Sequence, residues 1–210
     1  MEEKLQPEWK YQLQGLRGLN EPPVPKKPAL LVIDMQRYFC DAGAPAYSPD
    51  YEAVIEPAQK LIEIFGKLNL PVFATRYYSR EGGDPTTRWW GATLDESSPF
   101  VDVDPRLNLP ADSVVLDKHL YGTFSSTDLD LQLKKLGCDS VVICGVMTDL
   151  CCETTAREAF QLGYNVYFVG DATATKDPML HFAALATLAH GFAYIVTVDN
   201  VLKLLEGKDV

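Results

Sequence analysis

The sequence predicts an α/β fold with three layers, α/β/α, around a six-stranded, mostly parallel, doubly wound sheet of strand order 3-2-1-4-5-6. The first observation behind this prediction is a set of short, continuous apolar runs, such as ALLVID at 29–34, with the length of strands buried on both faces. The second is the amphipathic spacing of the segments between the runs, which is typical of helices that connect parallel strands.

The predicted elements follow one another along the chain without an internal repeat. Six apolar runs are predicted as strands, at 29–34, 71–76, 114–118, 140–145, 165–170 and 193–198. Apolar residues recur at helical spacing over 58–68, 129–136, about 150–162 and about 178–190. Gly137, Gly163 and Gly191 follow the last three of these segments, where a glycine commonly ends a helix.

Residues 1–28 are predicted to form an N-terminal arm and connector in front of a single domain at 29–210. The connector ends in EPPVPKKP, whose prolines favour an extended chain. A short helix within residues 8–19 would carry Trp9 and Leu13 on one side. This apolar side would pack either on the same domain or on a neighbouring subunit.

The composition restricts the classes of function and partner. The 210 residues carry a formal net charge of −10, which disfavours binding to nucleic acid or to an anionic membrane surface. No stretch approaches the roughly 20 apolar residues of a membrane span, and the N-terminus lacks the apolar core of a signal peptide. We therefore expect a cytoplasmic protein whose partner is a small molecule.

The motifs of common metal and cofactor sites are missing from the sequence, so we expect no metal and no cofactor. The five cysteines include no C-x-x-C pair, and the three histidines are scattered. The first predicted strand leads into MQRYF without the glycine-rich turn of a dinucleotide site, and GVMTDLCC lacks the ending of a phosphate loop. The cysteines are expected to be reduced thiols, because their number is odd and their density low.

Three chemically reactive residues fall at the carboxyl ends of predicted strands. Asp34 ends the first strand, Lys118 ends the third, and Cys151 opens the helix after the fourth. Strands 1 and 4 are neighbours in the predicted order, and strand 3 lies about 10 Å from strand 1, within reach of a lysine side chain. We therefore expect the three side chains to meet in one crevice at this edge of the sheet.

An acid, an amine and a thiol form a working set for nucleophilic catalysis. A thiol attacks as its thiolate, so either its pKa must fall or a base must take its proton. The positive end of the helix and Lys118 are expected to lower the pKa of Cys151, and Asp34 can accept the proton. The three residues together predict an activated nucleophile beside its base.

The stretches VIDMQRYF and GVMTDLCCETTAREAFQLGYNVYFVGDATAT, with Lys118 after a valine-rich strand, resemble the isochorismatase-like cysteine hydrolases. The resemblance covers about residues 29–202 and implies that family's fold, with a catalytic triad of Asp34, Lys118 and Cys151. It also implies that Cys151 reacts, that the adjacent Cys152 packs, and that the protein is a homodimer or a larger homo-oligomer.

The same resemblance implies a backbone feature beside the nucleophile. It places a cis peptide bond between Val146 and Met147. The backbone N–H groups of Met147 and Cys151 would then form an oxyanion hole, which stabilises the negative charge of a tetrahedral intermediate.

The function expected from the resemblance is hydrolysis of a C–N bond in a small amide or carbamoyl substrate through a thioester. The segment ATRYYSREGGDPTTRWW contains no histidine, whereas nicotinamidases carry a metal-binding histidine after the second strand. DMQRYF and YGTFSST resemble true isochorismatases, so hydrolysis of a vinyl ether through protonation by Asp34 is the alternative. A more distant alternative is an inactive redox or binding protein that uses Cys151 and Cys152.

Several residues are placed to line the predicted crevice and contact a substrate. These substrate-binding candidates are Gln36, Tyr38, Phe39, Arg88, Trp89, Trp90, Tyr121 and Phe124. Arg37 or Arg88 could bind a substrate carboxylate. The long connection at 77–113, which holds both tryptophans, is expected to act as a lid or binding element.

Overall fold

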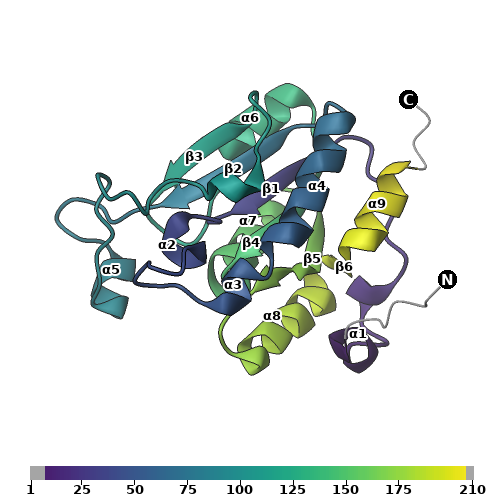
Figure 1. The fold of residues 1–210 in the computed structure, drawn as a ribbon. Helices are drawn as coiled ribbons and strands as arrows, with labels where there is room; N and C mark the ends of the chain where they lie inside the picture. Colours follow the sequence, from purple (N-terminus) through teal and green to yellow (C-terminus); the bar gives the residue numbers. More distant parts are fainter. Residues whose placement is uncertain (1–7, 207–210) are drawn as a thin grey trace.

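A computed structural model of the protein describes residues 8–206 and contains one six-stranded sheet. The strand order is β3-β2-β1-β4-β5-β6 and every neighbouring pair is parallel, so the predicted fold class and strand order are confirmed (Figure 1). The strands are β1 (Pro28–Ile33), β2 (Val72–Tyr77), β3 (Val114–Lys118), β4 (Ser140–Val146), β5 (Asn165–Ala174) and β6 (Tyr194–Val196).

Helices cover both faces of the sheet and so complete the three layers (Figure 1). The helices after β1 are α2 (Arg37–Cys40), α3 (Pro49–Glu52), α4 (Ile55–Lys67), α5 (Pro85–Trp90), α6 (Leu129–Leu136), α7 (Glu153–Gln161), α8 (Pro178–Gly191) and α9 (Val198–Glu206). One face carries α4 and α9, and the other carries α6, α7 and α8. No helix within residues 8–206 is long and apolar enough to cross a membrane.

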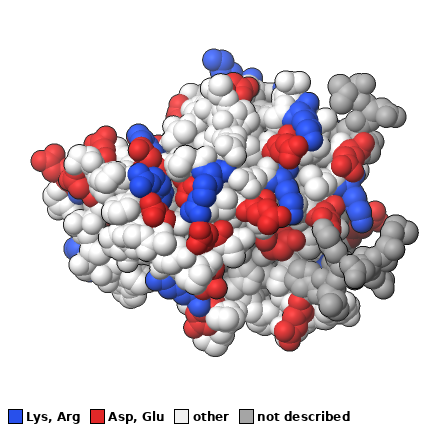
Figure 2. Space-filling view, viewed as in Figure 1, with Lys and Arg blue, Asp and Glu red and all other residues white. Residues whose placement is uncertain are grey.

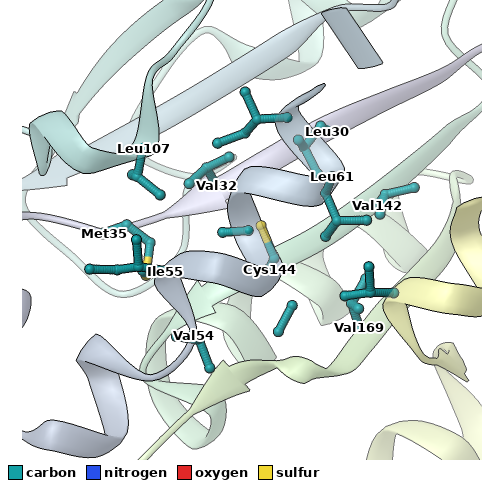
Figure 3. Packing of buried hydrophobic residues seen from close by; sticks show 14 of the residues in the cluster. Leu30, Val32, Met35, Val54, Ile55, Leu61, Leu107, Val142, Cys144 and Val169 are labelled. Atoms are coloured by element: carbon teal, nitrogen blue, oxygen red, sulfur yellow. The ribbon is translucent and has the colours of Figure 1, made fainter. Parts of the chain in front are cut away.

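The apolar runs are continuous because alternate residues of one strand enter two different cores. In β1, Leu30 and Val32 pack under α4, whereas Leu31 and Ile33 pack against the opposite helices. Figure 3 shows the first of these cores, where Leu30, Val32 and the free thiol of Cys144 lie beneath α4. A polar residue in either set would lose its contact with water, so both faces of the strand are apolar.

Acidic and basic side chains are interspersed on the face that carries α4 (Figure 2). Pairs one helical turn apart account for part of this pattern. Lys60 lies 2.8 Å from Glu56 and Lys67 lies 2.6 Å from Glu63. Such exposed pairs each contribute only a few tenths of a kcal/mol, roughly, to helix stability.

The structure differs from the sequence prediction at the C-terminal end of the fold. The predicted strand 193–198 is shorter, because β6 ends at Val196 and α9 begins at Val198. Thr197 caps α9: its Oγ1 accepts from the Asn200 N–H at 3.2 Å, and the Thr197 N–H donates to Asn200 Oδ1 at 3.1 Å. The sequence TVDN at 197–200 therefore contains the capping residues of a helix, although its first two residues fall within the predicted strand.

The arm packs on its own domain over the residues that the structure describes. It forms the short helix expected within residues 8–19, α1 (Glu8–Gln12), followed by a 3₁₀ turn η1 (Arg17–Leu19). Leu13 is buried in the core beneath α7 and α8, and the Trp9 ring lies against Gly170. Residues 1–7 of the predicted arm, and 207–210 of the predicted domain, lie outside the described part of the chain.

Candidate active site

The three reactive side chains meet at the carboxyl edge of the sheet. Lys118 Nζ lies 2.7 Å from Asp34 Oδ2 and 3.4 Å from Cys151 Sγ. Asp34 directly follows β1, Lys118 is the last residue of β3, and Cys151 lies in a single π-helical turn, η3 (Thr148–Cys152), after β4. The strand order therefore brings together residues that are up to 117 positions apart, between 34 and 151.

A threonine on the intervening strand fixes the Asp34 carboxylate. Thr75 Oγ1 donates to Asp34 Oδ1 at 2.6 Å and accepts from the Asp34 N–H at 2.9 Å. The backbone of Asp34 is left-handed, with φ of 48°. The other oxygen, Oδ2, faces Lys118 Nζ as an ion pair at 2.7 Å.

Sequence reasoning missed Thr75. Its only signal is a hydroxyl inside an otherwise apolar strand, FAT, next to the strand that ends at Asp34.

Lys118 is fully buried and remains charged because of its neighbours. Burial alone would lower the pKa of its ammonium, but the negative charge of Asp34 and the adjacent Cys151 raise that pKa above its usual value. The ammonium also donates to the Leu120 carbonyl at 2.9 Å and lies 5.8 Å from the centre of the Tyr77 ring. Lys118 is therefore a fixed positive charge beneath the site.

The surroundings of the Cys151 thiol raise its pKa above the ordinary value. Burial raises the pKa of this thiol, the Asp34 carboxylate raises it further, and Lys118 lowers it. The two neighbouring charges largely oppose each other, so burial decides the direction. Lys118 therefore acts on this pKa in the expected direction, but burial and Asp34 together act more strongly against it.

The backbone turns sharply between β4 and the nucleophile. The peptide bond between Val146 and Met147 is cis. Gly145 has a φ of 120°, and a Cβ there would lie 2.1 Å from the Ile33 carbonyl oxygen, so only glycine fits. The first hydrogen bond of the π-helical turn joins the Cys152 N–H to the Met147 carbonyl oxygen at 3.2 Å. The Cys151 N–H comes before this bond, so it is one of the N–H groups at the start of the turn that the turn itself does not pair.

A cavity of about 400 Å³ opens above Cys151 and Asp34. Six aromatic residues line it: Tyr38, Phe39, Tyr51, Tyr77, Trp90 and Tyr121. Trp90 belongs to α5, which Figure 1 shows projecting beyond the end of the sheet. Its Nε1 donates to Tyr121 Oη at 2.8 Å, so the long connection covers one side of the cavity.

Charged side chains of the cavity wall are mostly acidic. Among the residues in the described chain that line it, Lys176 is the one cation, whereas Asp34, Asp149 and Asp177 are acids. Lys176 is exposed at the rim, with its Nζ 5.9 Å from the centre of the Tyr51 ring.

Comparison with known proteins shows the family to which this chain belongs. The family model described as the isochorismatase domain matches residues 28–200. Nicotinamidase 3 of Arabidopsis thaliana is 36% identical over 192 residues, which cover 88% of this chain and 92% of that protein. This chain belongs to the isochorismatase family.

Solved structures of isochorismatase-like hydrolases share the fold. A cysteine hydrolase from Pseudomonas syringae pv. phaseolicola superposes with a TM-score of 0.81 at 26% identity, covering 89% of this chain and 98% of that one. N-carbamoylsarcosine amidase from Thermoplasma acidophilum superposes with a TM-score of 0.74 at 32% identity, covering 82% and 97%. The chain is therefore an enzyme, a hydrolase of the isochorismatase family.

Four of the eight predicted substrate-binding residues of this isochorismatase-family hydrolase line the cavity: Tyr38, Phe39, Trp90 and Tyr121. The prediction for the other four needs correction. Phe124 packs in the core between the sheet and α6, and Trp89 is 80% exposed on the outer side of α5. Arg88 is also exposed on α5 and does not line the cavity.

Gln36 has a structural role instead of a place in the cavity. Its Nε2 donates to the carbonyls of Tyr77 at 2.9 Å and Val101 at 2.7 Å, and its Oε1 accepts from the Tyr77 N–H at 2.8 Å. The fully buried amide thus ties the loop after β1 to the end of β2. Arg37 is also engaged elsewhere, because its guanidinium pairs with Asp41 at 3.0 Å.

No group of three or more His, Cys, Asp or Glu side chains within residues 8–206 is arranged to hold a metal ion. The cavity residues that sequence reasoning missed include Tyr51 on α3 and Asp149, Lys176 and Leu180 near the nucleophile turn and α8. Only the fold brings these segments to the crevice, although Asp149 lies two positions before Cys151 in the family motif.

Proposed function

We propose that this isochorismatase-family enzyme is a cysteine-dependent hydrolase that cleaves the C–N bond of a small amide or carbamoyl compound through a thioester. The observation that carries this proposal is the contact of Lys118 Nζ with both Asp34 and Cys151 Sγ at the floor of the cavity. A nucleophile, a base and a fixed positive charge are the groups that acyl transfer from an amide requires.

The first half of the proposed reaction forms the thioester. Asp34 takes the proton of the Cys151 thiol, and the resulting thiolate forms a bond to the carbonyl carbon. The carbonyl oxygen becomes an oxyanion, which the backbone N–H groups of Met147 and Cys151 stabilise. The protonated Asp34 then gives its proton to the leaving nitrogen, the C–N bond breaks, and ammonia or an amine departs.

The second half regenerates the enzyme. Asp34, again a carboxylate, removes a proton from a water molecule that attacks the thioester carbon. The C–S bond breaks, the acid product leaves, and the proton on Asp34 returns to the sulfur of Cys151. Lys118 stays protonated throughout, because the charges beside it hold its pKa high, and it stabilises Asp34 and the transient thiolate.

The charge of the cavity supports an amide over isochorismate. Isochorismate carries two carboxylates, and a dianion needs cationic partners when it leaves water. Of the described residues that line the cavity, Lys176 at its rim is the one cation, and Asp149 and Asp177 oppose it. Its aromatic walls suit a flat, uncharged molecule, and the two amidase relatives, which are named for nicotinamide and N-carbamoylsarcosine, support an amide as the substrate class.

The test is hydrolysis of a panel of small amides, ureas and isochorismate by the wild type and by two variants. Cys151→Ala should abolish release of ammonia or amine, because no other group can form the thioester. Asp34→Asn should abolish it as well, because the base is lost. Vinyl-ether hydrolysis needs Asp34 but no thiol, so activity that survives Cys151→Ala and is lost in Asp34→Asn would establish the isochorismatase reaction instead.

We also propose that the enzyme works in the cytoplasm as a homodimer or larger homo-oligomer. All five cysteines are free thiols, which supports a reducing compartment. Large apolar side chains exposed on the surface, Trp89 on α5 and Met179 on α8, support a subunit contact. Light scattering of the purified enzyme tests the assembly, and a monomer at micromolar concentration would contradict it.

A further inference from the structure

The turn that carries the nucleophile has an uncommon backbone conformation. Its two π-helical hydrogen bonds run from the Cys152 N–H to the Met147 carbonyl and from the Glu153 N–H to the Thr148 carbonyl. Such turns are rare in proteins, and they occur mostly as single turns at functional sites. A rare backbone conformation persists where neighbouring elements hold it. The contacts that other elements make with η3 therefore determine where Cys151 lies.

Helix α8 supplies one of these contacts. His181 lies near the start of α8, and its ring Nδ1 pairs with Thr148 Oγ1 at 2.9 Å. Thr148 is the first residue of η3 and is fully buried. Among the residues that the structure describes, His181 is the one hydrogen-bond partner of this hydroxyl. A buried hydroxyl without a partner is unfavourable, so the bond holds the start of the turn against α8.

The His181 ring can keep this bond at neutral pH. Burial lowers the pKa of the ring below its usual 6.5, and the charge of Asp149 opposes this effect. A neutral imidazole has one nitrogen that donates and one that accepts, and a hydroxyl does both. Nδ1 and the Thr148 hydroxyl can therefore form their hydrogen bond in either tautomer of the ring.

A second threonine provides a matched contact on the same helix. Thr187, farther along α8, donates from its Oγ1 to Glu153 Oε1 at 3.0 Å. Both bonds join α8 to the segment after β4 through one threonine hydroxyl. Glu153 is the first residue of α7, however, so the Thr187 bond does not reach the turn that carries Cys151.

We propose that His181 is a positioning residue that holds the nucleophile turn in place for the proposed reaction. It acts through Thr148, three residues before Cys151 in the same turn. The proposal rests on the proposed function, in which Cys151 supplies both the thiol and an N–H of the oxyanion hole. A small displacement of the turn would misplace both groups relative to the substrate carbonyl. Most residues that line the cavity lie on other segments, so the loss should fall on kcat rather than on KM.

Alkylation of Cys151 by iodoacetamide tests the position of the sulfur without any substrate. Thr148→Val removes the hydroxyl and keeps the shape of the side chain, so the turn should loosen and admit water to the sulfur. Burial is the largest influence that raises the pKa of Cys151. The alkylation rate at pH 8 should therefore rise about three-fold or more, because the thiolate fraction increases. Thr187→Val should leave the rate unchanged. An unchanged or lower rate in Thr148→Val would overturn the proposal.

Steady-state kinetics on the amide that the wild type hydrolyses fastest separate positioning from binding. Thr148→Val and His181→Leu should each lower kcat about 10-fold or more and leave KM within about two-fold of the wild type. The double variant should be no slower than either single variant, because both lose the same bond. Thr187→Val should keep kcat within about two-fold.

Conservative variants show whether the hydrogen bond itself matters. Thr148→Ser keeps the hydroxyl, and His181→Asn places a polar amide atom close to the position of Nδ1. Each should recover most of the kcat that Thr148→Val and His181→Leu lose. Failure of both to recover activity, or additive losses in the double variant, would refute the role of the bond.

Two results distinguish positioning by His181 from a structural role and from failure of the proposed function. If the bond were merely structural, Thr148→Val would lower the melting temperature and leave kcat unchanged where the protein is folded. The proposed function fails if the wild type hydrolyses none of the amides and ureas in its panel, and the alkylation rates still decide whether the bond positions Cys151. A wild type that hydrolyses amides with a kcat insensitive to Thr148→Val refutes the role of His181 alone.

Discussion

The ammonium of Lys118 lies 2.7 Å from the carboxylate of Asp34, and the two side chains are 0% and 1% exposed. The contact spans β2, because β3 and β1 are not neighbours in the sheet. Each charge is tolerable inside the protein only because the other is present. The same pair sets the electrostatics of the nucleophile, so stability and activity depend on one contact.

Replacing Lys118 with methionine should destabilise the protein by about 3–5 kcal/mol, because it leaves the Asp34 carboxylate buried without a counter-charge. The variant should also lose activity. Urea unfolding measures the first effect. Adding Asp34→Leu to Lys118→Met should restore part of the lost stability without restoring activity. A loss below about 1 kcal/mol in the single variant would contradict the role of the pair.

The rate at which iodoacetamide alkylates Cys151 should keep rising as the pH increases past the ordinary thiol pKa of 9.0. The reason is that burial and Asp34 raise the pKa of this thiol, so its thiolate fraction is still small at neutral pH. Asp34→Asn removes one of the two raising influences and should move the profile to lower pH. Peptide mapping follows the alkylation of Cys151 itself. A rate that reaches its plateau below pH 8 in the wild type would show a resting thiolate instead.

Alkaline pH should destabilise the folded protein in part through the same cysteine. The folded pKa of Cys151 is raised above its unfolded value, so the folded state binds this proton more tightly. Its contribution to stability is complete below about pH 9 and falls by about 1.4 kcal/mol per pH unit above it. Cys151→Ala should therefore flatten the dependence of the unfolding free energy on pH between 9 and 11, and an unchanged slope would refute this linkage.

Cys152→Ala should affect packing and leave catalysis intact. Cys152 is fully buried among the helices of the second core and does not line the cavity. We expect a loss of about 1–3 kcal/mol in unfolding free energy, with kcat/KM within a few-fold of the wild type. Inactivation of Cys152→Ala at a temperature where it is folded would show that the two adjacent cysteines act together.

Trp90→Phe and Tyr121→Phe should each raise KM by a few-fold, because each removes one partner of the hydrogen bond that holds α5 over the cavity. The double variant should be little worse than either single one, since both lose the same bond. Trp89→Phe provides the control, because Trp89 is 80% exposed and makes no contact with the cavity. Additive effects would mean that the two residues act independently.

Deleting residues 1–24 should lower the melting temperature by several degrees without changing the number of subunits in the assembly. Leu13 is 2% exposed, and Gly18 lies so close to α8 that a Cβ would meet the Ala189 Cα at 2.7 Å. The arm therefore buries apolar surface on its own domain. Fewer subunits per assembly by light scattering, with an unchanged melting temperature, would show that the arm links subunits instead.

Much of the fold followed from local patterns in the sequence. β1 and β4 could be predicted because strands buried on both faces leave no place for polar residues, and the strand order followed from right-handed crossovers. The meeting of Asp34, Lys118 and Cys151 followed in turn, because parallel strands end at one edge. The start of α9 was missed because an apolar run overlapped it, although TVDN carries the capping residues Thr197 and Asn200.

The sequence by itself determined which reactive groups this protein has and at which edge of the sheet they lie. Only the tertiary structure decided that burial and Asp34 raise the pKa of the Cys151 thiol, that Gln36 is buried and hydrogen-bonded to the backbone, and that Tyr51 and Asp149 line the cavity. The reason is physical. Strand formation depends on neighbours a few residues away, but burial and the pKa of a side chain depend on groups that are distant in sequence and adjacent only in the folded chain.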